Sequence, residues 1–272
     1  MRISVLGSLE AELKGVQILP TAAKPRQILA LLAIYANQVL PVSALMEEIW
    51  GDAPPRSALT TLQTYILQLR RCMEAALDGE PGGSKELLLT RHGGYLLHTE
   101  PGSIDAHEHD RLSTLGQRAF DRGDHREAAE LFREALALWR GPALVDVRTG
   151  PLLEIEAMRL EESRLGVLER RIDVDLRLGR HGALLTELTA LAARHPLHEG
   201  LHAQAMVAFY RAGRPSAALD VFQNLRTRLV EELGIEPSQR LQLLQRAVLG
   251  SDPALDADTD AGTGRVLDRF AR

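Results

Sequence analysis

The sequence predicts a mainly α-helical protein with an N-terminal winged helix-turn-helix, which carries a small β-sheet and a β-hairpin wing, followed by a tetratricopeptide-like α-helical domain. Three observations predict this fold: strands, three helices and a hairpin in that order, a Pro-Gly linker after them, and a helical repeat marked by glycines beyond the linker. We expect the winged-helix domain over 1–98, the helical domain over 104–250 and a disordered tail over 251–272.

The composition is that of an ordinary globular chain. Of its 272 residues, 45% are hydrophobic and 25% are charged, and the net charge of −5 gives no overall sign of nucleic-acid binding. A single cysteine, Cys72, excludes a disulfide framework and a four-cysteine zinc site. The apolar stretch Gln27–Met46 is interrupted by Pro41 and by polar residues, which argues against a membrane span. We therefore expect a cytoplasmic protein.

Short strands and two helices are expected first. Residues 2–19 alternate loosely between apolar and polar, with glycines that mark tight turns, which predicts antiparallel strands. Pro25 opens a helix over 26–36, because proline is tolerated at the first helical position. Ser43 is the expected N-cap of a second helix, and Gly51 is its expected end.

A long third helix is expected over 56–76, with two different faces. Large apolar residues recur at helical spacing and mark the side that faces the core. These residues are Leu59, Leu62, Ile66, Leu69 and Met73. The opposite side carries Ser57, Thr61, Thr64, Gln68 and Arg71. Between Ala53 and Met73 the sequence has three arginines and no acidic residue.

A β-hairpin is expected to close the first domain. Leu87–Arg91 and Tyr95–His98 flank the turn sequence His92-Gly93-Gly94, which places Arg91 and His92 near the tip. Tyr95 is expected in the core beneath it. A hairpin after three helices is the order of elements in a winged helix-turn-helix.

A glycine-based repeat predicts paired helices in the second domain. Gly123 and Gly213 are each followed by alanine five residues later and by phenylalanine nine residues later, and Gly179 has leucines at both offsets. Gly179 and Gly213 are separated by the tetratricopeptide period, whereas additional residues are needed near 141–150 to bring Gly123 into register. In such repeats the small residue lets two helices approach closely and the aromatic ring fills the space between them.

The third helix is a candidate for reading the major groove of DNA, which admits one α-helix. Its threonines, Tyr65 and Gln68 can form hydrogen bonds with base edges, while Arg70 and Arg71 can contact phosphate or guanine. Because the helix start lacks carboxylates, nothing there repels the phosphate backbone. Arg91, at the hairpin tip, can enter a narrow minor groove. The alternative is an ordinary amphipathic helix with a solvated Thr/Gln face.

His198-Glu199-Gly200-Leu201-His202 fits the H-E-x-x-H signature of zinc proteases. The third histidine of the extended pattern is missing, and Gly200 weakens the helix that the motif needs. We therefore interpret the motif as a solvated helix start with partly packed histidines, and we expect no metal, no cofactor and no catalytic residue.

Three other patterns also have structural interpretations. His107 and His109 are expected at a solvated helix start, and Trp50 and Trp139 in the core. Arg170-Arg171 could touch DNA, but the mixed Glu/Arg sequence around it is typical of a salt-bridged surface.

Motifs spread over both halves of the chain carry a family resemblance. The N-terminal ones are Leu6-Gly7, Lys24-Pro25-Arg26-Gln27, Leu31-Leu32-Ala33, Leu45, Trp50-Gly51-Asp52, Pro54-Pro55, Ala58-Leu59, Leu69-Arg70-Arg71 and Gly94-Tyr95. The later ones are Ala135-Leu136-Ala137-Leu138-Trp139-Arg140-Gly141, His195-Pro196-Leu197-His198-Glu199 and Ala208-Phe209-Tyr210-Arg211-Ala212-Gly213-Arg214. With these motifs, residues 1–250 resemble the Streptomyces antibiotic regulatory protein family of transcriptional activators.

The resemblance implies a winged helix like that of response regulators, followed by a bacterial transcriptional activation domain. It implies binding to direct repeats in double-stranded DNA at promoters of secondary-metabolite clusters, with recruitment of RNA polymerase and its sigma factor. The implied DNA contacts are Thr60, Thr61, Thr64, Tyr65, Gln68 and Arg71 on the third helix, with Arg91 on the wing. Leu67 and Gln68 stand where basic residues are common in response regulators, which favours cooperative binding by two or more chains, and a homodimer is a further expectation.

The sequence also departs from longer relatives. None of its lysines, Lys14, Lys24 and Lys85, lies in a phosphate-binding loop, so we expect the ATPase module of those relatives to be absent. The main hypothesis is a sequence-specific DNA-binding transcriptional activator associated with the nucleoid, without enzymatic activity and without membrane contact. The alternative is a tetratricopeptide-type adaptor whose N-terminal domain binds protein instead of DNA.

Overall fold

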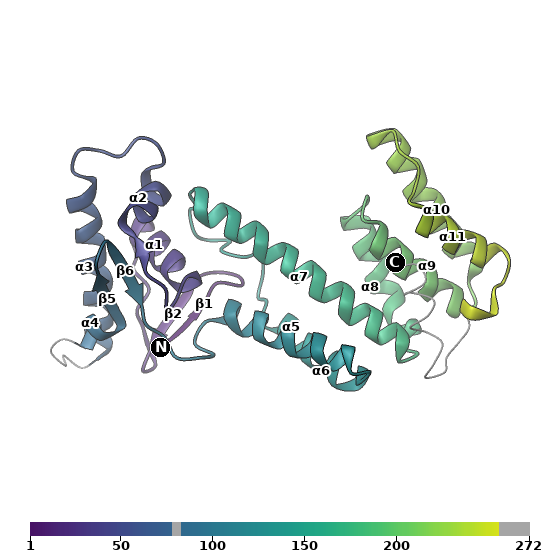
Figure 1. Ribbon diagram of the computed structural model, residues 1–272, viewed down its shortest axis with the longest axis horizontal. Helices are drawn as coiled ribbons and strands as arrows, with labels where there is room; N and C mark the ends of the chain where they lie inside the picture. Colours follow the sequence, from purple (N-terminus) through teal and green to yellow (C-terminus); the bar gives the residue numbers. More distant parts are fainter. Residues whose placement is uncertain (78–82, 256–272) are drawn as a thin grey trace. The chain divides into compact units, whose positions relative to one another are not determined.

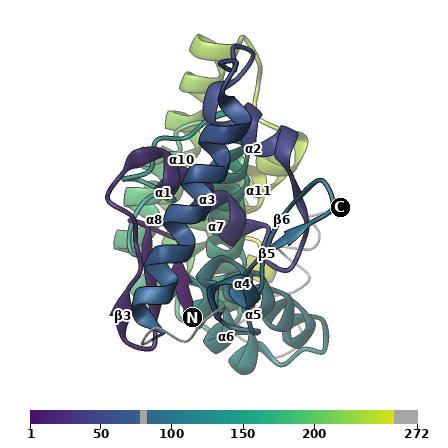
Figure 2. The same ribbon diagram turned by 90° about the vertical axis from the view of Figure 1, so that its left-hand side faces the viewer.

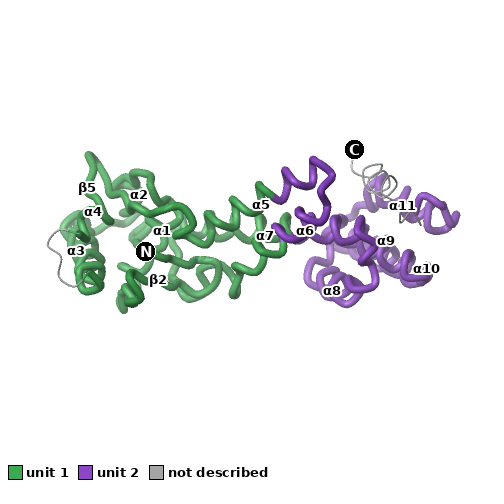
Figure 3. The backbone as a smooth tube through the Cα atoms, turned by 90° about the horizontal axis from the view of Figure 1, so that it is seen from below, with its two compact units in different colours: residues 1–115, 133–167 green, residues 116–132, 168–272 purple. Residues whose placement is uncertain are grey.

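The computed structural model describes residues 1–77 and 83–255 (Figure 1). By its contacts the chain divides into two compact units, shown in different colours in Figure 3. Unit 1 comprises Met1–Leu115 and Arg133–Val167, and unit 2 comprises Gly116–Phe132 and Leu168–Arg272. The linker at 99–103 is therefore not where the compact units separate, because unit 1 extends well into the helical region.

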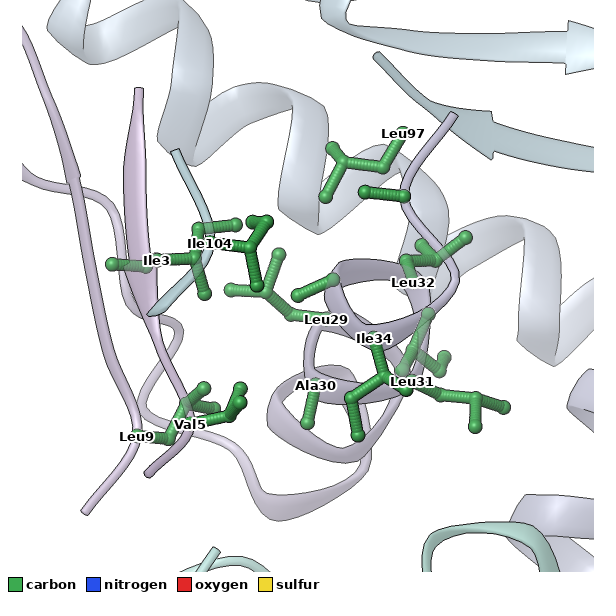
Figure 4. Packing of buried hydrophobic residues seen from close by; sticks show 14 of the residues in the cluster. Ile3, Val5, Leu9, Leu29, Ala30, Leu31, Leu32, Ile34, Leu97 and Ile104 are labelled. Carbon is green, nitrogen blue, oxygen red and sulfur yellow. The ribbon is translucent and has the colours of Figure 1, made fainter. Parts of the chain in front are cut away.

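The N-terminal sheet has the order β1-β2-β3 and is antiparallel, as the alternation predicts. Its strands are β1 (Arg2–Ser4), β2 (Glu10–Leu13) and β3 (Val16–Gln17). Ile3, Leu9 and Leu13 turn into the core, where they meet the helix that follows. In Figure 4, Ile3 and Ile104 lie on the side of that helix that carries Leu29.

The three expected helices are present, with shifted starts. They are α1 (Ala23–Ile34), α2 (Val42–Trp50) and α3 (Ala58–Ala76). Pro25 lies within the first turn of α1 and not at its first position, which is tolerated because first-turn N–H groups have no partner inside the helix. Ser43 does not cap α2, since Pro41 occupies the N-cap position. Gly51 ends α2 as predicted.

The predicted hairpin is confirmed as β5 (Leu88–Arg91) and β6 (Gly94–Leu97). Two neighbours of the hairpin were not predicted: the strand β4 (Leu40–Pro41), which pairs with β6, and the short helix α4 (Gly83–Leu87). Tyr95 is buried, as expected. Helix α1 thus packs against the N-terminal sheet through Leu29 and against the hairpin sheet on the side near Leu97 (Figure 4).

The rest of the described chain is helical. Its elements are α5 (Asp105–Asp121), α6 (His125–Ala137), α7 (Pro151–Arg177), α8 (His181–Arg194), α9 (Glu199–Arg211), α10 (Pro215–Arg228), the π-helical turn η1 (Leu229–Leu233), α11 (Gln239–Leu249) and the 3-10 turn η2 (Pro253–Leu255). Leu255 is buried, so ordered packing extends to that residue, and the remainder of the predicted tail, 256–272, lies outside the described residues. Within the described parts of the chain, no helix is long and apolar enough to span a bilayer.

The glycine repeat is confirmed by its backbone. Gly123, Gly179 and Gly213 each follow a helix and have φ of 82°, 72° and 71°. After each one, the next N–H bonds to the carbonyl five residues back, at 2.9–3.0 Å, which is the bond that closes a helix in a Schellman motif. The phenylalanine or leucine nine residues after each glycine is buried. A Cβ on Gly116 would lie 2.7 Å from the ring of Phe132, so α5 and α6 approach closely there.

The residues inserted between α6 and α7 hold the N-terminal sheet within unit 1. Arg140 and Leu144 donate backbone N–H groups to Leu6 and Val5, at 2.8 and 3.0 Å. Asp146 accepts the N–H of Leu9 at 2.7 Å and forms an ion pair with Arg26. The sequence indicated additional residues in this segment but not this use of them.

Two carboxylates also join the N-terminal residues of unit 1 to its helical part. Asp105 accepts the N–H groups of Val5 and Leu6 at 2.7 and 3.0 Å, and burial raises the pKa of its carboxyl group. Glu48 of α2 is 2% exposed and accepts the N–H groups of Gly150, Leu152 and Leu153 at 2.6, 2.9 and 3.1 Å. A carboxylate from the winged helix therefore caps the N-terminus of α7.

Unit 1 should lose stability at alkaline pH through Tyr35. Its hydroxyl donates to Glu156 at 2.6 Å, and this bond together with burial raises the pKa of Tyr35 to about 12. The ordinary pKa of tyrosine is about 10, so the unfolded chain releases this proton at a lower pH than the folded chain does. The stabilisation that the protonated hydroxyl gives the folded state is therefore complete below pH 10 and is lost as the pH rises toward 12. Urea unfolding at pH 8 and pH 11 should show a larger loss for the wild type than for Tyr35→Phe. Equal losses in the two proteins would contradict this assignment.

Candidate nucleic-acid interface

Helix α3 buries one side against the rest of unit 1. The buried residues are Ala58, Leu62, Ile66, Leu69, Met73 and Ala76. The prediction that Leu59 belongs to this side is wrong, because its side chain is 49% exposed. The helix begins at Ala58, and this residue, one helical turn before Leu62, takes the buried position in the first turn.

The outer side of α3 carries three members of the predicted polar row, Thr64, Gln68 and Arg71, together with Thr60. Thr60, Thr64, Gln68 and Arg71 are exposed, and Figure 2 shows α3 crossing the face of unit 1 that is turned toward the viewer. Leu67 lies among them and is 47% exposed. We call Thr60, Thr64, Leu67, Gln68 and Arg71 the α3 outer row.

Leu67 was not among the predicted contacts, although helical spacing alone gives its place on the outer side. Leu67 is seven residues after Thr60 and four before Arg71, so helical spacing places the three on one line. An exposed leucine there can contact the methyl group of thymine, as other apolar side chains do in the major groove. Gln63 is also exposed, on the edge of the row.

Two of the predicted contacts, Thr61 and Tyr65, are half-buried on the flank of α3. The ring of Tyr65 stacks on Trp50 of α2, with centroids 6.4 Å apart and planes at 22°. The Lys24 ammonium lies 5.0 Å from the centre of the same indole ring. This stack joins α2 to α3 beside the outer row, so the observed role of Tyr65 is to pack the two helices together.

Arg70 lies on the opposite flank and holds the hairpin. Its Nη2 donates to the carbonyl of Leu88 at 2.7 Å and to the hydroxyl of Thr90 at 2.9 Å, and its Nε donates to Leu88 at 3.1 Å. Direct contact of Arg70 with DNA stays a prediction, whereas its observed role is to bind α3 to β5.

The hairpin tip is anchored as well. Arg91 ends β5 and is exposed, opposite Gly94 in the strand pairing. The carbonyl of Gly93 accepts the N–H of Val42 at 2.9 Å, which binds the turn to the start of α2. The backbone that carries Arg91 is therefore attached to two helices of the winged helix.

The exposed side of α3 and the hairpin tip carry arginines and no competing carboxylate among the described residues, which favours binding of a polyanion. Among the described residues, neither Arg71 nor Arg91 forms an ion pair. Glu74, the first carboxylate along α3, is half-buried and accepts the hydroxyl of Ser84 at 2.6 Å. The first four turns of the helix thus present hydroxyl, amide and guanidinium groups without a competing carboxylate, which is what contact with phosphates and base edges requires.

The residues of the H-E-x-x-H motif have structural partners in unit 2. His198 is the N-cap of α9, while His202 is buried with its Nδ1 3.0 Å from the carbonyl of His198. Glu199 accepts the N–H of Ser238 at 3.1 Å, ahead of α11. In the part of the chain that the structure describes, no three His, Cys, Asp or Glu side chains are grouped to share a metal ion.

The other patterns give mixed outcomes. The expectation of a solvated helix start is wrong for His109, which is 0% exposed because it packs edge-on against Trp139 in the core of unit 1. Trp139 is buried as expected, and Trp50 is partly buried. The salt-bridge interpretation is confirmed for Arg171, which pairs with Asp175 at 3.4 Å and with Glu187.

Comparison with known proteins identifies both parts of the chain. Residues 17–97 match the family described as transcriptional regulatory protein, C terminal, and residues 104–249 match the bacterial transcriptional activator domain. Regulatory protein DnrI of Streptomyces peucetius is 55% identical over 94% of each chain. The chain belongs to the Streptomyces antibiotic regulatory protein family. Regulatory protein AfsR of Streptomyces coelicolor is 36% identical over 98% of this chain and 26% of its own length.

The fold of this chain also resembles that of a solved structure. The structure of Mycobacterium tuberculosis EmbR in complex with a low affinity phosphopeptide matches with a TM-score of 0.87 and 29% identity, over 98% of this chain and 70% of that chain. The winged helix followed by a helical domain is thereby confirmed. As a member of the Streptomyces antibiotic regulatory protein family, the chain is a transcriptional regulator.

Proposed function

We propose that this regulator is a sequence-specific DNA-binding activator of an antibiotic or other secondary-metabolite gene cluster. In this proposal residues 1–98 bind direct repeats in promoter DNA, and residues 104–250 support contact with RNA polymerase or its sigma factor and association of two chains. The observation that carries the proposal is the α3 outer row, an exposed line of hydroxyl, amide and guanidinium groups on a helix whose other side is buried.

The contacts divide by chemistry. Gln68 and Thr64 are suited to base edges, with the glutamine amide complementary to adenine. Arg71, in the C-terminal half of α3, suits phosphate or guanine, and Arg91 on the wing suits a narrow minor groove. Phosphate contacts fix the register of the helix on the duplex, whereas base contacts select the sequence.

The test begins with selection of binding sites from a pool of random double-stranded DNA, followed by gel shifts with the enriched duplex. We expect Gln68→Ala to cost about 1–3 kcal/mol of binding free energy and to relax selection at the bases it contacts. Arg71→Ala should weaken binding and reduce the slope of log affinity against log salt by about one unit if it contacts a phosphate.

Arg2→Ala is the matched control, because Arg2 is exposed on the N-terminal sheet, across α1 from the hairpin. It should bind as the wild type does, and circular dichroism should show that all three variants are folded. Wild-type affinity of both α3 variants, or failure of the pool to enrich any sequence, would favour the adaptor alternative.

A further inference from the structure

A hollow of about 590 Å³ lies on one side of α9 in unit 2, where α8 and α10 both pack against that helix (Figure 3). Its lining residues lie within 189–193 of α8, 202–209 of α9 and 217–228 of α10, with Glu231 of η1, and all of them belong to unit 2. We call this space the α9 hollow. Its volume is within the range of about 300–1,000 Å³ that is typical of sites for drug-sized ligands.

The floor of the α9 hollow is one side of α9. His202, Ala205 and Phe209 are three and four positions apart, so helical spacing places them on one line, and all three are buried. The walls include alanines of the two neighbouring helices, among them Ala192 of α8 and Ala217 of α10. Because a methyl group reaches only a short way from the backbone, these alanines leave the space above the floor unfilled. The floor is therefore mainly apolar, with one polar side chain in it.

That polar side chain is His202, which is 5% exposed and has one unused acceptor. Its Nδ1 lies 3.0 Å from the carbonyl oxygen of His198, which can only accept, so Nδ1 carries the ring proton. Burial lowers the pKa of His202, so the ring is neutral at neutral pH and its Nε2 is an acceptor. No described residue forms a hydrogen bond with Nε2, and protein atoms do not fully enclose it. A molecule in the hollow that His202 lines can therefore donate to this nitrogen.

The charged side chains of the lining do not select a charged occupant. Asp220, Arg228 and Glu231 are exposed and include both signs, so they keep their hydration. A charge on a molecule that lies against Ala205 and Phe209 would lose its own hydration without an ion partner on the floor, which is costly. The occupant that fits these surroundings is therefore uncharged.

We propose that the α9 hollow binds an uncharged, mainly apolar small molecule whose hydroxyl or N–H group donates to His202 Nε2. The size of the hollow favours a small molecule over a helix of a partner protein. Ten residues of helix, about 15 Å long and about 10 Å across with side chains, occupy roughly twice the volume that the hollow encloses. This binding goes beyond the proposed DNA contacts and involves no residue of the α3 outer row or the wing.

The probes are hydroxypyrene and methoxypyrene, two fluorescent and uncharged ring systems that differ in one hydrogen-bond donor, in anisotropy titrations against the full chain. We expect hydroxypyrene to bind about fivefold more tightly, because only the hydroxyl can donate to His202 Nε2. His202→Phe keeps an aromatic ring but removes the acceptor. In this variant the two probes should bind equally, and methoxypyrene should bind as it does to the wild type.

A second variant tests whether the probes occupy the α9 hollow. Ala192→Leu fills part of the space and should weaken the binding of both probes about tenfold. Ala183→Leu is the matched control, because Ala183 is an exposed alanine of the same helix, six positions before Thr189 and outside the lining. It should bind both probes as the wild type does, and urea unfolding should show that all three variants are folded.

Three outcomes would overturn the proposal. Equal affinity of the wild type for the two probes, or a preference that persists in His202→Phe, would show that the acceptor is not used. Equal effects of Ala192→Leu and Ala183→Leu would place the probes outside the hollow. Tighter binding of a helical leucine–lysine peptide that displaces both probes, and that Ala192→Leu weakens, would assign the hollow to a partner helix. None of these results bears on the α3 interface, because gel shifts measure that interface with other residues and another ligand.

Discussion

Glu48→Ala is expected to destabilise unit 1 by about 3–5 kcal/mol, the largest effect we predict for a single substitution. The Glu48 carboxylate is 2% exposed and accepts three backbone N–H groups at the start of α7, as well as the side-chain amide of Gln27 at 2.7 Å. Alanine would leave the N–H groups of Gly150, Leu152 and Leu153 without this acceptor, while the Gln27 amide would keep its bond to the carbonyl of residue 48. It would also remove a carboxylate from the N-terminus of a 27-residue helix.

The measurement is urea unfolding followed by circular dichroism, with hydrogen exchange of the Gly150, Leu152 and Leu153 amides. Exchange should accelerate there, because these amides lose their acceptor. Glu47→Ala is the matched control, since Glu47 is the exposed neighbour on the same helix, and it should change stability by no more than about 0.5 kcal/mol. If the two variants unfolded at the same urea concentration, the carboxylate would not be what holds α7 to the winged helix.

The sequence could predict the helices and the hairpin because their signals are local. The repeat around Gly123, Gly179 and Gly213 is one example, since a glycine with positive φ and a buried residue nine positions later are both set within a single helical hairpin. The apolar stripe of α3 is another, and it failed only at Leu59, where the exact start of the helix decides which residue is buried.

The contacts that hold the start of α7 against α2 could not be predicted, because the residues that form them are distant in sequence. Glu48 and Gly150 are separated by 102 positions, and no periodicity marks a glutamate that will be buried against backbone N–H groups. A charged residue at that position of an amphipathic helix is more often solvated. Leu67 was placed by the family resemblance at a position where basic residues are common, but it was not counted among the DNA contacts because it carries no hydrogen-bonding group.

The exposed residues of the candidate site could be predicted from the sequence, whereas the positions of the flanking residues depend on tertiary contacts. Helical spacing placed Thr64, Gln68 and Arg71 on the outer side of α3, where they are exposed, whereas Thr60 came from the family resemblance and Thr61, which the same spacing included, is half-buried. The side chains of Tyr65 and Arg70 are on the flanks, where Trp50 and the carbonyl of Leu88 engage them. These two residues therefore connect the outer row to α2 and to the wing, a role that only the packing of separate elements reveals.

Gly94→Ala is expected to destabilise the wing by about 3 kcal/mol and to weaken DNA binding. A Cβ at position 94 would lie 2.3 Å from the carbonyl oxygen of Leu40 and 3.0 Å from a methyl group of Val39. The oxygen belongs to the backbone of β4, so the clash cannot be relieved by rotating a side chain. The β4–β6 pairing must open, and Arg91, which pairs with Gly94 across the hairpin, moves with it.

Gly93 provides the control within the same turn. It has a φ of 76°, and nothing lies within 4 Å of an added Cβ, so Gly93→Asn should cost less than about 1 kcal/mol because asparagine tolerates this conformation. Urea unfolding and gel shifts with the selected duplex should therefore separate the two variants. If the loss of DNA affinity in Gly94→Ala matched that of Arg91→Ala, the wing would act mainly by carrying that arginine. Wild-type binding by a destabilised Gly94→Ala protein would instead remove the wing from the interface and leave α3 as the whole contact.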